Sequence, residues 1–220
     1  MTSSVYAAVA SAAGAALLTA VLAPLVLTRL PEPADGQGKP RYRDLATVPF
    51  VSGCAVLSGL AAAIAWLTGP PTIQPFWAVL SVLGVLLAAV DARTTWLPLP
   101  LTRAAWLAMV VAAAVVVGLG GGWAVARAAV GAALAGGIFL LVWLIARGGF
   151  GFGDVRFAPL VGSATAAHSW SLLIWALLLG SLAGAGHGLL RLVLRRTGPF
   201  PYAPSMLLGA YLAGGATWAC

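Results

Sequence analysis

Two carboxylates are the residues of this sequence best placed to do chemistry, because they lie where the chain is otherwise apolar. Asp91 ends one apolar run and Asp154 begins another. The other three acids, Glu32, Asp35 and Asp44, fall together in a hydrophilic loop. A carboxylate at membrane depth costs about 2.5 kcal/mol or more unless it is paired or hydrated, so such a residue usually marks a function. An arginine two positions after each acid leaves a helix-end ion pair as the alternative.

Two carboxyl groups that share one site cannot both ionise easily, so one holds a proton while the other is charged. That arrangement supplies a general acid and a general base for the attack of water on an amide. A helix N-terminus stabilises an anion and a C-terminus does not, which favours Asp154 as the base and Asp91 as the acid. No Ser or Thr has an evident His and acid partner, and we interpret His168 as part of a solvated turn and His187 as a packing residue.

The composition defines the protein class. The chain has 220 residues, of which 61% are apolar and 8% charged, and its mean hydropathy is +1.00. These values predict an all-α, polytopic integral membrane bundle whose surroundings are the lipid bilayer. The formal charge of +7 lies in short gaps between apolar runs, where basic residues fix topology, so no nucleic-acid partner is expected. Cys54 and Cys220 form no C-x-x-C pair, which indicates neither a metal site nor a disulfide.

Apolar runs predict about eight membrane-spanning helices, within a range of six to eight. They are expected at residues 5–27, 47–68, 76–91, 104–118, 123–146, 157–167, 170–190 and 202–218. The run at 157–167 is too short to cross a bilayer unaided, which makes it a half-helix, a tilted helix or a helix shielded by its neighbours. We expect one membrane domain over residues 1–220, with N-terminal spans and a short loop in 1–75 and the core in 76–220.

Basic residues predict the orientation, since short cytoplasmic loops are rich in Lys and Arg. With eight spans and the N-terminus outside, all basic residues except Arg127 lie inside. The inside residues are Arg29, Lys39, Arg41, Arg43, Arg93, Arg103, Arg147, Arg156, Arg191, Arg195 and Arg196. Asp91 ends a span that runs inward and Asp154 begins one that runs outward, so both acids are expected at the cytoplasmic face. Fusion of the sixth and seventh spans would break this alternation.

Glycines form two patterns, one before Asp154 and one in the seventh span. The first group leaves the backbone without side-chain bulk and free to adopt positive φ, so that an extended substrate could lie alongside. It comprises Gly148, Gly149, Gly151 and Gly153. The second group shares one helix face, which predicts close approach of another helix. It comprises Gly180, Gly184 and Gly188. The first loop, residues 28–44, is expected to be a solvated connector without a catalytic role.

Three segments carry a family signature: DARTTWLPLPLT at 91–102, GFGDVR at 151–156 and GPFPYAPSMLLGAY at 198–211. They resemble the first aspartate motif, the G-x-G-D motif and the terminal Pro-Phe segment of the type IV prepilin peptidases. Pro98 and Thr102 fit the register of the first motif, whereas Leu99 stands where the family has Asn or Asp. Arg156 stands where the family usually has Lys. The resemblance covers about residues 75–218.

The resemblance implies an aspartic endopeptidase of the inner (plasma) membrane that removes basic, glycine-ended leaders from prepilin-like proteins near the cytoplasmic face. Asp91 and Asp154 would be the catalytic pair, without a cofactor. The residues that complete the motifs and position the substrate would be Gly151, Gly153, Arg156, Pro98 and Thr102. The short, cysteine-free first loop replaces the zinc-binding domain of larger members, so neither a metal nor methyltransferase activity is expected.

Three alternatives stay open at this point. Presenilin-type intramembrane proteases also use G-x-G-D, although no Pro-Ala-Leu counterpart occurs near the last span. A proton-coupled transporter also uses intramembrane acids, more often near the midplane and in repeated halves, and no repeat is evident. A non-catalytic protein of pilus or secretion assembly would keep the motif without the activity. The sequence names neither the pilin nor the oligomeric state.

Overall fold

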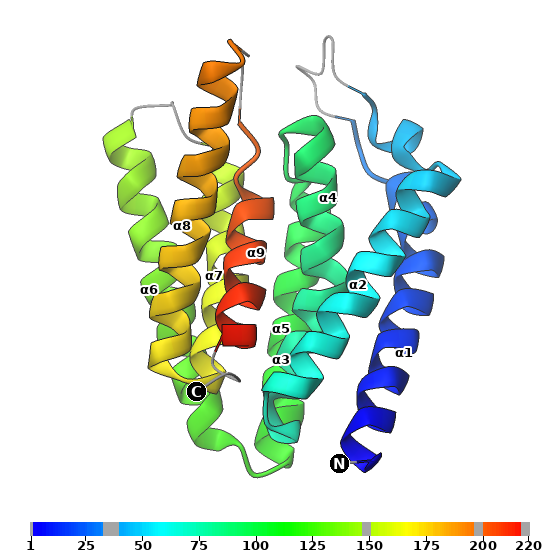
Figure 1. Ribbon diagram of the computed structural model, residues 1–220, viewed down its shortest axis with the longest axis vertical. Coiled ribbons are helices and arrows are strands. Elements are labelled where there is room, and N and C mark those ends of the chain that lie inside the picture. The colour runs from blue at the N-terminus through cyan, green and yellow to red at the C-terminus, as the bar shows by residue number, and fades with distance from the viewer. Residues whose placement is uncertain (1, 33–39, 147–150, 196–199, 217–220) are drawn as a thin grey trace.

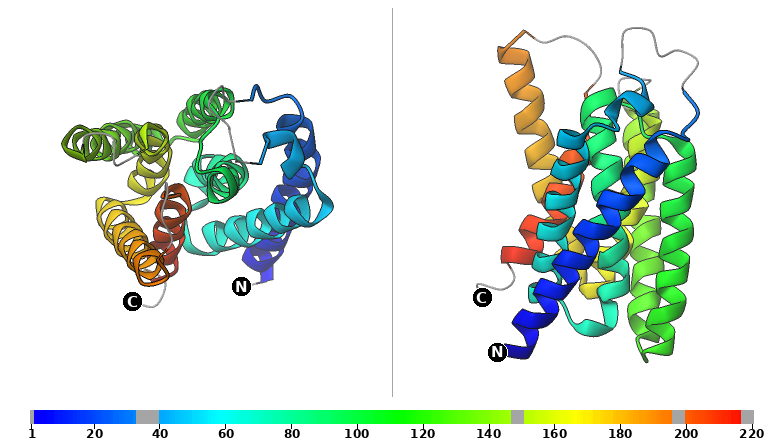
Figure 2. Two further views of the ribbon diagram at one scale, coloured as in Figure 1. Left: turned by 90° about the horizontal axis from the view of Figure 1, so that it is seen from above. Right: turned by 90° about the vertical axis from the view of Figure 1, so that its right-hand side faces the viewer.

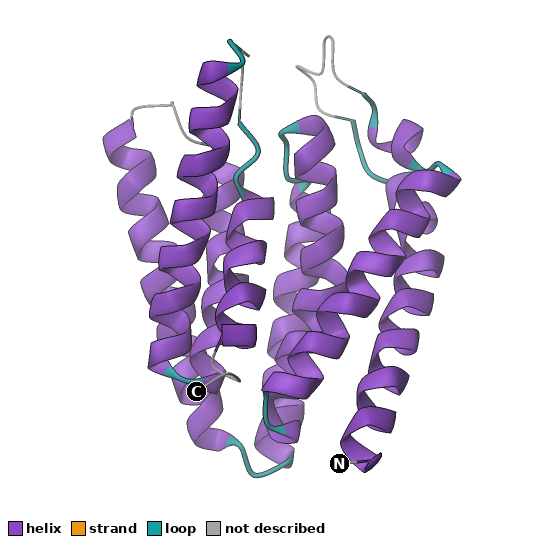
Figure 3. Ribbon diagram, in the orientation of Figure 1, coloured by secondary structure: helices purple, strands orange, loops and turns teal. Residues whose placement is uncertain are grey.

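The computed structural model describes residues 2–32, 40–146, 151–195 and 200–216, which form a bundle of helices running up and down (Figure 1). The helices are α1 (Thr2–Leu27), α2 (Val48–Thr68), α3 (Gln74–Val79), α4 (Val85–Thr94), α5 (Leu99–Gly118), α6 (Gly122–Ala146), α7 (Phe152–His168), α8 (Trp170–Val193) and α9 (Ala203–Ala216). Short 3₁₀ turns form η1 (Tyr42–Leu45) and η2 (Pro71–Ile73). Within these described ranges the secondary structure is helical, with no strand (Figure 3).

The third span is one continuous rod with an irregular centre. A π-helical stretch, η3 (Leu80–Gly84), joins α3 to α4 without a break in direction. Together with the five longest single helices, this rod gives six described segments that are long and apolar enough to cross a membrane. The predicted all-α membrane bundle with six to eight spans is therefore confirmed.

The short α7 is the most enclosed helix of the bundle. Most of its side chains are buried, including large ones such as Phe157 and Leu160. It packs along α6 and also contacts α5, α8 and α9. Of the three predicted explanations for its shortness, shielding by neighbours is the one that the structure shows. A helix with 17 residues can lie in the membrane because protein, rather than lipid, covers its polar groups.

The sixth and seventh spans are separate helices. Ser169 adopts an extended conformation between α7 and α8, and its side chain accepts the N–H of Leu172 at 3.0 Å. Serine is a favoured N-cap because its hydroxyl satisfies one of the free N–H groups in the first turn. The chain reverses at this residue, so the predicted alternation of spans holds.

The bundle has two ends with different polar content. We call the end where both acids lie the Asp91 end, and the opposite end the His168 end. At the Asp91 end, α4 finishes and α7 starts, next to the ends of α1 and α8 (Figure 1). The described basic residues lie in these end segments, in the α1–α2 connection or near the start of α5, except for Arg127 near the start of α6. At the His168 end, α7 turns into α8. Lys39, Arg147 and Arg196 lie outside the described residues, as do Gly148, Gly149 and Cys220.

The last helix joins two parts of the bundle. α9 packs along α8 and also contacts α2 and α4, and the view from above places it between α8 and the third span (Figure 2). Gly180 of α8 faces the backbone of Met206, and Gly184 lies against the ring of Tyr202. These contacts confirm the predicted close approach at two glycines. A Cβ atom at Gly188 would have no neighbour within 4 Å, so the prediction is wrong there.

Several helices begin earlier than predicted. Two of these shifts place parts of the aspartate motifs inside helices. The sixth span begins at Phe152 rather than 157, and α5 begins at Leu99 rather than 104. Proline explains the second case, because Pro100 occupies the first turn of α5, where no intrahelical N–H is needed. Pro98 is the residue that caps α5, and Thr102 lies inside it. The predicted division of the domain at residues 75 and 76 stays a prediction.

Candidate active site

Asp91 lies in the last full turn of α4, and only 4% of its surface is exposed. The helix stops just after it, because Thr95 adopts a left-handed conformation with φ of 57° and its N–H closes on the carbonyl of Asp91 at 2.7 Å. A β-branched residue rarely adopts positive φ, so this turn stores backbone strain next to an acid. The buried hydroxyl of Thr94 secures the turn by accepting the N–H of Trp96 at 3.2 Å.

Asp154 lies in the first turn of α7 and is 5% exposed. Gly151 is the N-cap residue, and its carbonyl accepts the N–H of Asp154 at 3.1 Å. The Oδ1 atom of Asp154 is buried and has no hydrogen-bond partner. A buried carboxyl oxygen without a partner is costly, so native proteins keep such groups chiefly where they serve a function.

The two acids meet at the first residue of α9. The backbone N–H of Ala203 donates to Oδ2 of Asp91 at 3.2 Å and also interacts with the carboxyl group of Asp154. The two carboxyl groups interact electrostatically with each other. Because the first N–H groups of a helix have no intrahelical acceptor, α9 presents a free donor between them. We refer to Asp91 and Asp154 together as the acid pair.

The segments that carry the two acids also touch each other. A Cβ atom at Gly153 would lie 3.0 Å from Cβ and Cδ1 of Leu97, so glycine allows this approach without displacing Leu97. Leu97 precedes the buried Pro98, whose carbonyl accepts the hydroxyl of Thr102 at 3.1 Å. Gly153 therefore places the start of α7 against the segment that leads into α5, where Pro98 and Thr102 lie. The role of these three residues in the site stays a prediction.

Two other predictions about the G-x-G-D segment concern positive φ at its glycines and a site role for Arg156. Positive φ is wrong for Gly151, whose φ is −72°, and Gly153 is a helical residue. The guanidinium of Arg156 lies over the ring of Phe152, 4.7 Å from its centroid. The carbonyl of Arg156 accepts the indole N–H of Trp106 at 3.0 Å. Arg156 thus packs the outer side of the α7 start, and the buried Oδ1 of Asp154 receives no donor from it.

The assignment of acid and base stays a prediction. The position of Asp154 in the first turn of α7 favours its anion, as the sequence indicates. Against this, Asp91 accepts a backbone N–H while one oxygen of Asp154 has no partner. The helix position thus favours the anion on Asp154, whereas the hydrogen bonds favour the anion on Asp91. A coupled pair titrates as a unit, so the measurable quantities belong to both residues.

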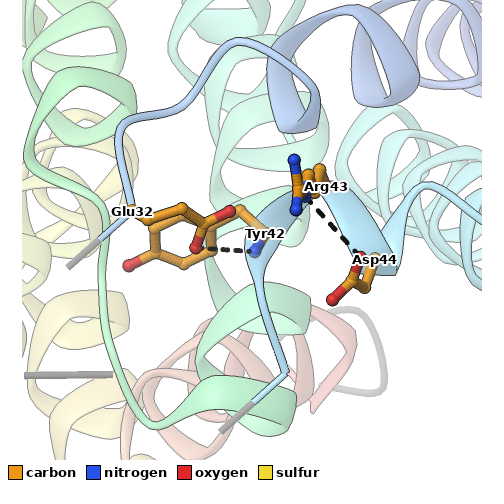
Figure 4. Close-up of polar contacts among 4 residues, drawn as sticks. All are labelled: Glu32, Tyr42, Arg43 and Asp44. Carbon is orange, nitrogen blue, oxygen red and sulfur yellow. Dashed lines mark hydrogen bonds and ion pairs between the residues drawn. The ribbon is translucent and has the colours of Figure 1, made fainter. Parts of the chain in front are cut away.

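Sequence reasoning missed two contributors at this end of the bundle. Ala203 contributes only a backbone N–H, for which a side-chain pattern gives no signal. Tyr42, in the loop expected to be a solvated connector, is 4% exposed and interacts electrostatically with Asp91. Its neighbours Arg43 and Asp44 form an exposed ion pair at 3.9 Å on the other side of η1 (Figure 4). An aromatic residue within a charged loop is the signal that could have identified Tyr42.

No group of three or more His, Cys, Asp or Glu side chains with the geometry of a metal site occurs in the described part of the chain. Cys54 is a buried free cysteine in α2.

The family model of the type IV leader peptidases matches residues 77–189. The chain belongs to the type IV leader peptidase family. The match runs from within α3 to within α8 and so includes both acids and the G-x-G-D segment, whereas α1, α2 and Ala203 lie outside it. No curated protein and no solved structure matches the chain at a significant level. The protein is thus a leader-peptidase-like protease whose long apolar helices are those of a multi-pass membrane protein.

Proposed function

We propose that this peptidase is an aspartic endopeptidase that uses Asp91 and Asp154 to remove leader peptides from prepilin-like precursors at the cytoplasmic face of the inner membrane. The observation that carries the proposal is the convergence of two buried carboxyl groups on the N–H of Ala203. Membership of the leader peptidase family supports peptide-bond hydrolysis as the reaction. The acid pair then needs no further nucleophile, because water is the attacking group.

In the reaction, one carboxylate accepts a proton from water while the water oxygen bonds to the scissile carbonyl carbon. The other carboxyl group donates its proton to the carbonyl oxygen, which gives a gem-diol. When the carbon–nitrogen bond breaks, the protonated carboxyl group gives its proton to the leaving nitrogen. A hydroxyl of the gem-diol gives a proton to the other carboxylate as the new carboxyl group forms, so the acid pair again holds one proton. The buried position of both groups strengthens their interaction with the reacting atoms, since the local dielectric constant is low.

Charge supports the orientation of the site. Exposed arginines at the Asp91 end include Arg41, Arg43 and Arg195, whereas Arg127 is the described arginine near the other end. Basic residues remain on the cytoplasmic side during insertion, so this asymmetry supports a cytoplasmic acid pair. The substrate's apolar helix would then lie in the bilayer beside the bundle, with its basic leader in the cytoplasm.

The position of the acids disfavours proton-coupled transport. Asp91 lies three residues before the end of α4 and Asp154 in the first turn of α7, so both are near one end of the bundle. Ion-coupling acids of transporters lie near the membrane midplane, between repeated halves. A non-catalytic assembly protein remains an outcome of the experiment below.

The test is co-expression with a prepilin-like precursor that has a basic, glycine-ended leader followed by an apolar helix. Leader removal is followed on a gel for the wild type, Asp91→Asn and Asp154→Asn. Each substitution keeps the size of the side chain but removes the acid, so processing should fall at least about a hundredfold. Asp44→Asn is the matched control, because Asp44 is an exposed acid at the same end and should leave processing unchanged.

Normal processing by either Asn variant would refute the acid pair. A wild-type protein that inserts stably and processes no precursor would favour the assembly role. Quantification of each variant in the membrane fraction separates loss of chemistry from loss of protein.

A further inference from the structure

The peptide group between Tyr202 and Ala203 is held on both sides by hydrogen bonds. Its N–H, on Ala203, donates to Oδ2 of Asp91 at 3.2 Å. Its carbonyl, on Tyr202, accepts the N–H groups of Ser205 at 3.0 Å and Met206 at 3.2 Å, which lie in the first turn of α9. Because a peptide group is planar, its carbonyl and its N–H turn together. The orientation of the first turn of α9 therefore determines where this N–H points.

The three positions that follow Ala203 in α9 offer the acids no replacement donor. Pro204 has no N–H, and the N–H groups of Ser205 and Met206 already donate to the carbonyl of Tyr202. The first turn of a helix usually has several free N–H groups, so this start of α9 is unusually restricted. A displacement of Ala203 would leave Asp91 without a donor from the next residues.

The ring of Tyr202 is packed between two other helices. It lies against Gly184 of α8, where an added Cβ atom would overlap its Cε2 atom. It also packs on Phe139, a buried residue of α6, with the ring centroids 5.6 Å apart. Aromatic pairs at this separation attract each other beyond the effect of their buried area. The residue that precedes α9 is thus held by α8 and α6.

The rest of α9 is held by separate contacts. α9 runs beside α8 (Figure 1), and a Cβ atom at Gly209 would overlap the backbone of Gly180, so the two helices touch directly there. The hydroxyls of Tyr211 and Ser81 lie 2.8 Å apart and link α9 to the third span. Both contacts lie beyond the first turn of α9. Loss of the Tyr202 ring should therefore release the start of the helix without detaching the helix.

We propose that Tyr202 is a positioning residue of the peptidase. Its ring, held between Gly184 and Phe139, fixes the start of α9 and thereby directs the N–H of Ala203 at the acid pair. The inference rests on the proposed function, in which Asp91 and Asp154 are catalytic. A carboxyl group that loses its donor is free to rotate, and a small misplacement of a reacting group slows the chemical step.

The experiment measures processing kinetics of the full-length protein in detergent with a purified prepilin-like precursor. Tyr202→Leu keeps an apolar side chain but removes the ring. It should lower kcat about tenfold and change KM less than about twofold, because the chemical step is affected and precursor binding is not. The assay is run well below the melting temperature of each variant, so that lower stability is not counted as lost chemistry.

Tyr202→Phe is the conservative variant. It keeps the ring and its contacts with Gly184 and Phe139, and it loses the hydrogen bond between the hydroxyl and Ser181, an exposed residue of α8. Its kcat should stay within about twofold of the wild type, which assigns the effect to the ring.

Gly184→Ala displaces the ring while leaving Tyr202 in place, and it should lower kcat about fivefold. Gly186→Ala is the matched control in the same helix, because a Cβ atom there has no neighbour within 4 Å. Since leucine has no Cε2 atom at this position, Gly184→Ala should cause less than about a twofold further loss in the Tyr202→Leu protein. Independent, multiplicative losses would overturn the link from Gly184 through Tyr202.

Wild-type kcat in Tyr202→Leu, or a loss confined to melting temperature, would overturn the role of Tyr202. An equal loss of kcat in Tyr202→Phe and Tyr202→Leu would also overturn it, because the ring would not be the cause. These outcomes leave the proposed function intact as long as Asp91→Asn and Asp154→Asn remain inactive. If either Asn variant processes the precursor normally, the proposed function itself fails, so the two failures are distinguishable.

Discussion

The two ends of α7 differ in whether their buried polar groups have hydrogen-bond partners. At its first turn, Asp154 keeps a buried carboxyl oxygen without a hydrogen-bond partner. At its last turn, Nη2 of Arg127 reaches across from α6 and donates to the carbonyls of Ala167 at 2.7 Å and His168 at 3.2 Å. The carbonyls that end a helix have no partner within it, so Arg127 supplies what the helix lacks.

This difference separates stability from chemistry along a single helix. The His168 end secures α7 through charge-assisted hydrogen bonds, even though Nε of Arg127 itself is buried without a partner. The first turn of α7, at the Asp91 end, leaves Oδ1 of Asp154 without a hydrogen-bond partner. Substitutions at the His168 end should therefore act mainly on stability, and substitutions at the Asp154 end mainly on activity.

Arg127→Met should have the largest effect on stability. It leaves the carbonyls of Ala167 and His168 without their donor, which costs about 2 to 3 kcal/mol. The measurement is thermal denaturation of the detergent-solubilised protein. Arg103→Met, at an exposed position of α5, is the control and should melt like the wild type. An Arg127→Met protein with unchanged stability would remove the proposed contrast between the two ends.

Gly153→Ala should have an intermediate effect, this time on activity. The added Cβ meets Cβ and Cδ1 of Leu97 at 3.0 Å, a contact so tight that the start of α7, with Asp154, shifts unless Leu97 gives way. We expect processing to fall about tenfold with little change in melting temperature. Gly188→Ala is the control, since a Cβ there has no neighbour within 4 Å.

The same contact offers a rescue. Leu97→Ala removes two of the three atoms that a Cβ at Gly153 would meet, so the double variant should recover part of the activity. If Gly153→Ala is as active as the wild type, the start of α7 tolerates displacement and the glycine is not needed for close approach.

Thr102→Val should have the smallest effect. Its hydroxyl bonds to the carbonyl of Pro98, but that carbonyl also accepts the backbone N–H of Thr102 at 3.0 Å. No buried acceptor is left without a donor, so we expect about a twofold loss in processing and under about 1 kcal/mol in stability. A complete loss, restored by Thr102→Ser, would instead indicate that the hydroxyl positions the substrate directly.

Much of the site's location could be predicted from charge and hydropathy. The alternation of apolar runs and basic gaps predicts Asp91 and Asp154 at the same end, and in the structure both acids lie at one end of the bundle. The residues that bring the motifs into contact were harder to predict from the sequence. Gly153 was expected to provide unusual φ, whereas it provides room for Leu97, which is a contact between segments distant in sequence.

Long-range placement explains the residues that sequence reasoning missed. Tyr42 lies in a charged loop where its aromatic ring is a signal for burial, but the spacing of residues 28–44 does not indicate which helices that ring meets. The N–H of Ala203 is identical in chemistry to every other backbone N–H. Its position between two carboxyl groups arises only when α9 packs against α4 and α7. Such contacts depend on tertiary packing, which propensity and spacing do not encode.

The enclosure of α7 has a consequence for biogenesis. A nascent helix that carries Asp154, Arg156 and His168 within 17 residues partitions poorly into lipid by itself. We therefore expect it to enter the bilayer together with α6, the long apolar helix along which it packs. The acid pair also needs the N–H of Ala203, so the site is complete only after α8 and the start of α9 have been synthesised.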